Sequence, residues 1–429
     1  MDFDDSLACT VQAVRQHLPD LAAEHFRVIR DIEGRLHLVV PDETDDALLD
    51  ALNETLIARL QHFAGSSRPA VRAGDTLTGE ALLSEPVLIQ IVDGFPCRVI
   101  ERRAMGSDWI VQPDDNSSDD SKRFVFFSLK GGVGRSTALA LWARHLCQQG
   151  KTVLVIDLDL EAPGLGAQLL ESTGKPQYGI ADWLVHDLVG ANTAELPSQM
   201  CRQSPVADVG LWVAPAFGAK TDLNRENVIA KLARAYLDKQ DDDGLVSYAS
   251  RLKIMVKALE LEYQPDVVLI DSRAGLHETV AAPLLHLNAE VLCFAVDMPV
   301  TWQGYKYLFS HLAQLAQTSI TLGLATSWRD RIQMVSARAL PGTRAEFIAN
   351  AYSLWVDTLY DEQEPEDGDV FSFDERNESA PHYPIVIPRS DLFERFDPVK
   401  QLNELSESQI NETFGAFFKA MWQRLESTQ

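Results

Sequence analysis

Seven short apolar segments recur between residues 124 and 388, and this feature constrains the fold most strongly. Longer stretches with helical spacing separate them. The segments are Phe124 to Ser128, Thr152 to Asp157, Leu211 to Pro215, Asp266 to Asp271, Glu290 to Asp297, Ile332 to Ser336 and Pro384 to Pro388. Continuous apolar strands that alternate with helices are typical of a parallel sheet covered on both faces. The sequence therefore predicts an α/β domain with a mostly parallel sheet, whose ligands bind at the carboxyl ends of the strands.

A polar segment from Pro113 to Lys122 precedes these strands and contains no apolar residue, as is typical of a solvated linker. It predicts an acidic linker over 113–122 between a first domain, 1–112, and a second domain, 123–429. The first domain is expected to be a small α+β fold. Strands are expected at 26–30, 36–40, 87–92 and 98–101, and a helix is expected at 45–63. Its scattered histidines form no chemical pattern.

Two acidic stretches interrupt the second domain, at 238–243 and at 361–378. Such stretches are either solvated surface loops or docking sites for a basic partner. The longer one is interpreted as an acidic insert over 361–380.

The C-terminal segment 406–427 is predicted to be a helix with one apolar face. Its acidic residues Glu412 and Glu426 offset Lys419 and Arg424, whereas helices that lie in a membrane interface usually carry a cationic polar face. The pattern therefore favours packing against the sheet over membrane attachment.

The net charge of -25 comes from 63 acidic and 38 basic side chains. This charge repels phosphate backbones and anionic lipid, so broad nucleic-acid binding is not expected. The five cysteines lie far apart and never in a CxxC spacing, which argues against a zinc site or a disulfide framework. The acidic start and the lack of an apolar run of about 20 residues favour a cytoplasmic protein without a membrane segment.

The segment Lys-Gly-Gly-Val-Gly-Arg-Ser, residues 130–136, stands between a predicted strand and a predicted helix. Its glycines let backbone N–H groups approach phosphate oxygens, and the helix N-terminus adds a partial positive charge. The Ser136 hydroxyl is placed to ligate Mg²⁺. The segment therefore predicts a loop that binds the phosphate chain of a nucleotide.

This loop resembles the deviant Walker A loop of the ParA/MinD-like ATPases of the SIMIBI class of P-loop proteins. More narrowly, it resembles the KGGVGR-motif variant branch, in which arginine replaces the usual lysine, here at Arg135. Three further segments match in the same order, at 155–165, 177–184 and 268–276. The resemblance does not cover the residues before the linker or the acidic insert.

The resemblance implies ATP and Mg²⁺ as cofactors and a homodimer formed on ATP binding. The catalytic residues it implies are Asp159, which orients the attacking water, Lys130, which reaches the nucleotide of the partner subunit, and Arg135. The metal would be held by Ser136, Asp157 and Asp271. The nucleotide contacts would be Lys130, Gly131, Gly132, Val133, Gly134, Arg135, Ser136, Thr137 and Arg273.

Two positions stay open. Arg273 either contacts phosphate or the opposite subunit, or forms a structural salt bridge. The residues that contact the adenine are the second open point. Relatives often have an asparagine there, at the end of a late strand, whereas this chain has Ser336 and Arg338.

The leading interpretation is a Mg²⁺-ATP-dependent dimerisation switch with slow hydrolysis. It would act on an unknown protein partner through the first domain or the acidic insert. By resemblance, it would belong to a multi-protein signalling or antiviral defence system. The alternatives are an ATP-binding scaffold without turnover, a ParA-like partition ATPase, which the acidic charge disfavours, and a small-molecule ligase of the same fold.

Overall fold

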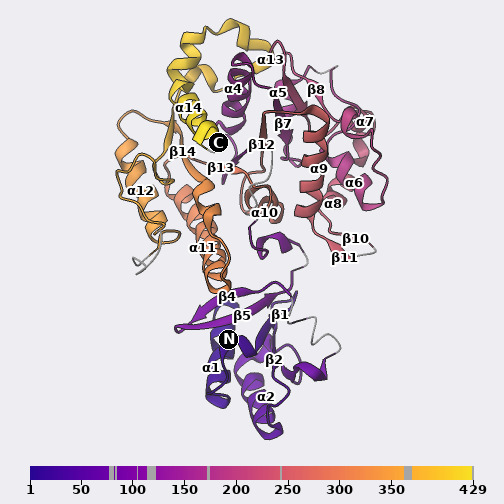
Figure 1. The fold of residues 1–429 in the computed structure, drawn as a ribbon, viewed down its shortest axis with the longest axis vertical. Coiled ribbons are helices and arrows are strands. Elements are labelled where there is room, and N and C mark those ends of the chain that lie inside the picture. Colours follow the sequence, from indigo (N-terminus) through magenta and orange to yellow (C-terminus); the bar gives the residue numbers. More distant parts are fainter. Residues whose placement is uncertain are drawn as a thin grey trace. The chain divides into compact units, whose positions relative to one another are not determined.

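The computed structural model describes residues 1–76, 82, 85–103, 105–113, 122–171, 174–241, 244–361 and 370–427. Most of the predicted linker and parts of both acidic stretches therefore lie outside the described residues. The chain divides into two compact units, drawn in Figure 1. The first combines 1–112 with 311–326, and the second combines 113–310 with 327–429.

The first unit contains a five-stranded mixed sheet in the order β3-β2-β1-β5-β4. Helices α1 and α2 share a hydrophobic core with this sheet, to which Val11, Leu52 and Val28 belong. In chain order the elements are α1 Phe3–His17, β1 Arg27–Arg30, β2 Leu36–Val40, α2 Asp46–Leu60, β3 Ala70–Arg72, β4 Leu88–Val92 and β5 Phe95–Glu101. The expected strands and the expected helix are confirmed, whereas α1 and β3 were not predicted.

The segment 311–326, which was predicted to belong to the second domain, lies in the first unit. Its residues 311–322 form the second part of helix α11, Pro299–Leu322. The Thr318 hydroxyl accepts a hydrogen bond from the backbone N–H of Ile89 at 2.8 Å, and the Ser319 hydroxyl donates one to Gln112. Helical spacing alone could not reveal these long-range partners.

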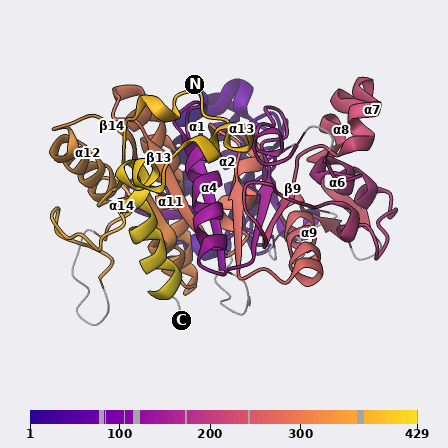
Figure 2. The same cartoon turned by 90° about the horizontal axis from the view of Figure 1, so that it is seen from above.

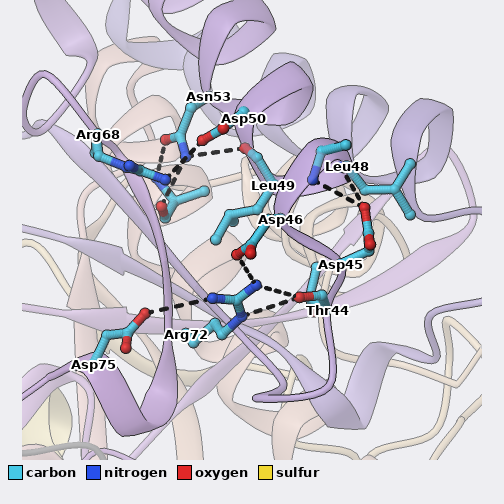
Figure 3. Close-up of polar contacts among 12 residues, drawn as sticks. Thr44, Asp45, Asp46, Leu48, Leu49, Asp50, Asn53, Arg68, Arg72 and Asp75 are labelled. Carbon is cyan, nitrogen blue, oxygen red and sulfur yellow. Dashed lines mark hydrogen bonds and ion pairs between the residues drawn. The ribbon is translucent and has the colours of Figure 1, made fainter.

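The side chain of Asn53 links strand β3 to helix α2 through hydrogen bonds, and Figure 3 shows it among the polar contacts of this region. Its amide nitrogen donates to the carbonyls of Leu49 and Ala70, both at 3.0 Å, and its amide oxygen accepts from Ala70 N at 2.8 Å. Asn53 is 5% exposed. Both main-chain groups of Ala70 therefore depend on one buried side chain.

We expect Asn53→Ala to destabilise the β3 region by about 2–4 kcal/mol, because it leaves buried main-chain groups without partners. Hydrogen exchange of peptides that cover residues 66–72 would measure this loss. The control is Arg68→Ala, which removes an exposed ion pair to Asp50 and should change protection by less than about 1 kcal/mol. Equal protection in the two variants would contradict the role of Asn53.

The second unit contains an eight-stranded sheet in the order β15-β14-β13-β6-β12-β7-β9-β8. All neighbouring pairs are parallel except β8 with β9. The strands are β6 Lys122–Ser128, β7 Val153–Asp157, β8 Arg202–Gln203, β9 Leu211–Ala214, β12 Val267–Asp271, β13 Glu290–Ala295, β14 Ile332–Ala339 and β15 Ile385–Pro388. The seven predicted strands and the mostly parallel α/β sheet are confirmed.

Helices join these strands and cover the sheet (Figure 1). Phe124 and Phe126 of β6 enter the core formed with helices α4 and α14, and Phe127 on the other face packs edge-on against Tyr305 of α11. The remaining helices and the hairpin strands are α4 Arg135–Gln148, α5 Leu165–Leu169, α6 Ile180–Leu188, α7 Ala219–Leu223, α8 Val228–Ala235, β10 Lys239–Asp241, β11 Gly244–Val246, α9 Tyr248–Tyr263, α10 Ala281–Leu285, α12 Arg344–Val356, α13 Pro398–Gln401 and α14 Glu407–Ser427.

The C-terminal helix α14 packs against the sheet, as predicted. The Phe417 ring lies 6.4 Å from Trp142 and 6.5 Å from Phe126, and the Phe418 ring stacks on His145 at 4.5 Å between centroids. Figure 2 shows α14 and α4 in the view from above. In the part of the chain that the structure describes, no helix is both long and apolar enough to cross a membrane.

Candidate functional site

The glycine-rich loop connects the end of β6 at Ser128 to the first residue of α4, Arg135. Gly132 and Gly134 have positive φ angles of 75° and 89°, which side chains with a Cβ rarely adopt. A Cβ built on either residue would meet no atom within 4 Å, and the same is true of Gly131. The glycines are therefore required by the backbone path, and one side of the loop is open enough for a phosphate chain to approach the main chain.

Asp157 and Asp271 end two neighbouring parallel strands and are aligned in register. Asp157 is fully buried and accepts hydrogen bonds from the backbone N–H groups of Asp159, at 3.2 Å, and Gly166, at 3.3 Å. Burial, with the neighbouring charge of Asp271, raises the pKa of Asp157 to about 8. Burial and the charge of Asp271 therefore both disfavour the ionised form of the Asp157 carboxyl.

Arg135 lies among these carboxylates and is only 8% exposed. Its Nε donates to Asp271 Oδ1 at 2.5 Å, and its two terminal nitrogens reach Ser128 Oγ at 3.3 Å and Asp159 Oδ2 at 3.4 Å. Burial raises the pKa of Asp159, and the positive charge of Arg135 opposes that shift. The guanidinium therefore acts as the counter-charge of the acidic cluster, a role that the sequence analysis did not predict.

The Ser136 hydroxyl donates to Asp271 Oδ2 at 2.7 Å. A hydroxyl and a carboxylate are hard oxygen ligands that suit Mg²⁺, which in nucleotide sites takes one or two protein carboxylates and completes its shell with phosphate oxygens and water. The described residues contain no group of three or more His, Cys, Asp or Glu side chains that could hold a metal by themselves. The oxygen atoms of Ser136 and Asp271 fit the ligand chemistry of Mg²⁺.

Arg273 forms an ion pair with Glu161, and both side chains are 27% exposed. The pair joins the segment after β7 to the segment after β12. In addition, the backbone N–H of Gly275 donates to the Ser128 carbonyl at 3.0 Å. The sequence analysis did not identify Glu161, although its place two residues after Asp159 was a usable signal. Lys130 has an exposed side chain.

A cavity of about 160 Å³ lies beside the loop, and Gly132, Thr137, Arg338 and Phe393 are among the residues that line it. Arg338 donates to the Gly132 carbonyl at 3.0 Å and to Glu394 at 2.9 Å. Of the two residues suggested at the adenine, Arg338 therefore faces this cavity. Ser336 lines a different cavity of about 450 Å³ on the same sheet edge. Phe393 and Glu394 were missed, because their segment follows the last strand without a recognisable motif.

Comparisons with known proteins gave matches only among solved structures: no family model and no curated protein matches the chain. ParA of pNOB8 bound to nonspecific DNA is 16% identical with a TM-score of 0.43, over 72% of this chain and 100% of that chain. MinD of Aquifex aeolicus is 17% identical with a TM-score of 0.42, over 71% and 97%. An ATP complex of a McdA variant from Cyanothece is 16% identical with a TM-score of 0.41, over 71% and 97%.

The strand, glycine-rich loop and helix, set in a mostly parallel sheet, define an α/β protein of the P-loop type. The similar structures include ParA and MinD proteins, which belong to the family that the loop sequence resembles.

Proposed function

We propose that this protein binds Mg²⁺-ATP at the loop formed by residues 130–137 and hydrolyses the ATP slowly. The observation that supports this most strongly is the open glycine loop directly beside the carboxylates of Asp159 and Asp271. Backbone N–H groups for phosphate and acidic residues for metal and water are the parts that phosphoryl transfer requires.

In this proposal each residue has a separate task. The N–H groups of the loop and the start of α4 bind the phosphates, and Ser136 and Asp271 hold Mg²⁺, which would neutralise charge on the phosphate oxygens. Asp157 supports the metal shell from the neighbouring strand. Asp159 orients the attacking water, and Arg135 supplies positive charge at the terminal phosphates.

Slow turnover follows from the position of Arg135. Its guanidinium is held by Asp271 and Asp159, so it must exchange these partners for phosphate oxygens when ATP binds. The planar guanidinium can bind phosphate oxygens tightly through two parallel hydrogen bonds. However, only interactions that strengthen in the transition state raise the rate, so tight binding of ATP by Arg135 is compatible with slow turnover.

We further propose that ATP binding drives homodimer formation, with Lys130 reaching the nucleotide of the second subunit. Lys130→Ala is then expected to stay monomeric in Mg²⁺-ATP and to bind ATP more weakly than the parent. Mass in solution with and without Mg²⁺-ATP tests this. Lys151→Ala serves as the control, because the Lys151 side chain is 37% exposed and approaches Asp266 at 3.9 Å. An ATP-dependent dimer of Lys130→Ala would contradict the role of Lys130.

The partner is proposed to be a protein that binds residues 1–112 or the acidic insert 361–380, as one component of a bacterial signalling or antiviral defence system. Two alternatives are kept, a scaffold that binds ATP without turnover and a partition or positioning ATPase. Phosphate release measured on the samples used for mass separates the first from the proposed switch, because a scaffold would dimerise without releasing phosphate.

A partition ATPase would require DNA binding, and we expect none of appreciable strength at physiological salt. The net charge of -25 repels the phosphate backbone. Fluorescence anisotropy with a nonspecific duplex and Mg²⁺-ATP measures the affinity. Salt-sensitive binding at about 10 µM or tighter would favour the partition alternative, since nonspecific binding typically falls between about 1 and 100 µM.

A further inference from the structure

The first unit contains a cavity of about 410 Å³, a volume within the usual range of small-molecule sites. Strands β1 and β5 are parallel, and Arg30 at the end of β1 is aligned with Glu101 at the end of β5. Both residues line the cavity, which therefore lies at an edge where two parallel strands end together. The other lining residues that matter here are Phe3, Leu88, Gln90, Arg103 and Gln314.

Arginines gather around this cavity, although acidic residues outnumber basic ones in the whole chain by 63 to 38. Arg30, Arg102 and Arg103 all line it. Arg30 pairs with Glu101 at 2.8 Å, and Arg102 pairs with Glu85 at 2.8 Å. Among the described residues, Arg103 has no ion-pair partner within 4 Å, so its charge is available to a ligand.

Arg30 is held rigidly and retains an unsatisfied donor. It is 8% exposed, its Nη1 donates to Glu101, and its guanidinium carbon lies 4.3 Å from the centre of the Phe3 ring. Within the part of the chain that the structure describes, its Nε is buried and has no hydrogen-bond partner. Buried polar groups are nearly always paired, so the contacts of Arg30 leave part of its donor capacity unused.

The two guanidinium groups of Arg30 and Arg103 are close enough to influence each other. Desolvation lowers the pKa of Arg103, the carboxylate of Glu101 opposes that shift, and the positive charge of Arg30 adds to it. A negative charge near a desolvated cation favours its charged form, so an anionic ligand in the cavity would stabilise the Arg103 guanidinium.

We propose that this cavity binds a small phosphate monoester, with its phosphate at Arg30 and Arg103. Arginine matches phosphate oxygens through a planar fork of donors. The amides of Gln90 and Gln314 would hydrogen-bond the polar groups of the esterified part, and Phe3 and Leu88 would contact its carbon skeleton. The proposal concerns the first unit alone and does not depend on the nucleotide site.

Isothermal titration of the full chain with inorganic phosphate, glucose 6-phosphate and AMP tests the proposal. We expect the monoesters to bind, and Arg103→Gln to weaken them about 10-fold or more, as loss of one charge-assisted hydrogen bond implies. Arg103→Lys should recover part of the affinity. The control is Arg68→Gln, because Arg68 is an exposed arginine of the same unit that pairs with Asp50. This variant should bind the monoesters with the affinity of the parent.

The loop at 130–137 is a second possible phosphate site, so the same titrations are made with Arg135→Ala. Monoester binding that persists in Arg135→Ala but weakens in Arg103→Gln supports the proposal. Binding lost in Arg135→Ala and kept in Arg103→Gln would assign the phosphate to the loop and overturn it. The proposal would also be overturned if none of the three probes binds. The same holds if the dicarboxylate succinate binds as tightly as the monoesters.

Discussion

Arg135→Ala is expected to lose ATP binding, with an affinity about 100-fold or more below that of the parent. Two charge-assisted hydrogen bonds to phosphate, each contributing about 1.5–3 kcal/mol, account for a loss of this size. The structure adds a second reason. Arg135 is the counter-charge of Asp271 and Asp159, so without it these carboxylates would repel the phosphates at short range. Titration with ATP in the presence of Mg²⁺ measures the effect.

The matched control is Arg144→Ala on the same helix α4, because Arg144 pairs with the half-exposed Glu407. It should bind ATP like the parent, and thermal unfolding of both variants should show that the fold is intact. If Arg135→Ala binds and hydrolyses ATP normally, Lys130 or Arg273 must supply the charge instead. Arg135→Lys is expected to bind ATP and to turn it over faster, since the ammonium is a compact charge that follows the reacting oxygens more freely.

Asp159→Ala is expected to abolish hydrolysis while ATP binding is retained. In the proposed reaction its carboxylate orients the attacking water, a contribution of about 100-fold or more in rate for a positioned base or orienting group. Its removal also frees one terminal nitrogen of Arg135, which should leave ATP affinity equal or higher. Phosphate release under saturating ATP, together with an ATP titration of the same sample, measures both quantities.

Asp391→Ala provides a control for Asp159→Ala, because the Asp391 side chain is 90% exposed and approaches Arg389 at 3.8 Å. Retained phosphate release in Asp159→Ala would assign the water to another group. Loss of ATP binding in Asp159→Ala would show instead that Asp159 supports the nucleotide and not the chemistry.

The sheet was predictable because the strands are buried on both faces, so each forms a continuous apolar run such as Phe124 to Ser128. The glycine loop was predictable because a backbone with positive φ at Gly132 and Gly134 admits few other residues. Asp157 and Asp271, which the resemblance implied as metal ligands, end two neighbouring strands and are aligned in register.

What could not be predicted depends on side-chain direction or on distant partners. Nothing in the loop sequence indicates that the Arg135 guanidinium contacts Asp271 and Asp159 instead of lying free in the loop. Helix α1 was missed although its buried apolar residues Leu7, Val11 and Val14 follow helical spacing. Strand β3 has only three residues and is held by Asn53, a contact that no local pattern encodes.

Helix α11 has 24 residues, so it is a rod of about 36 Å whose first part is built into the second unit and whose remainder is built into the first. Scission at the predicted linker would therefore not yield two self-sufficient fragments. A piece ending at residue 112 would lack the helical turns that bind Ile89, Trp109 and Gln112.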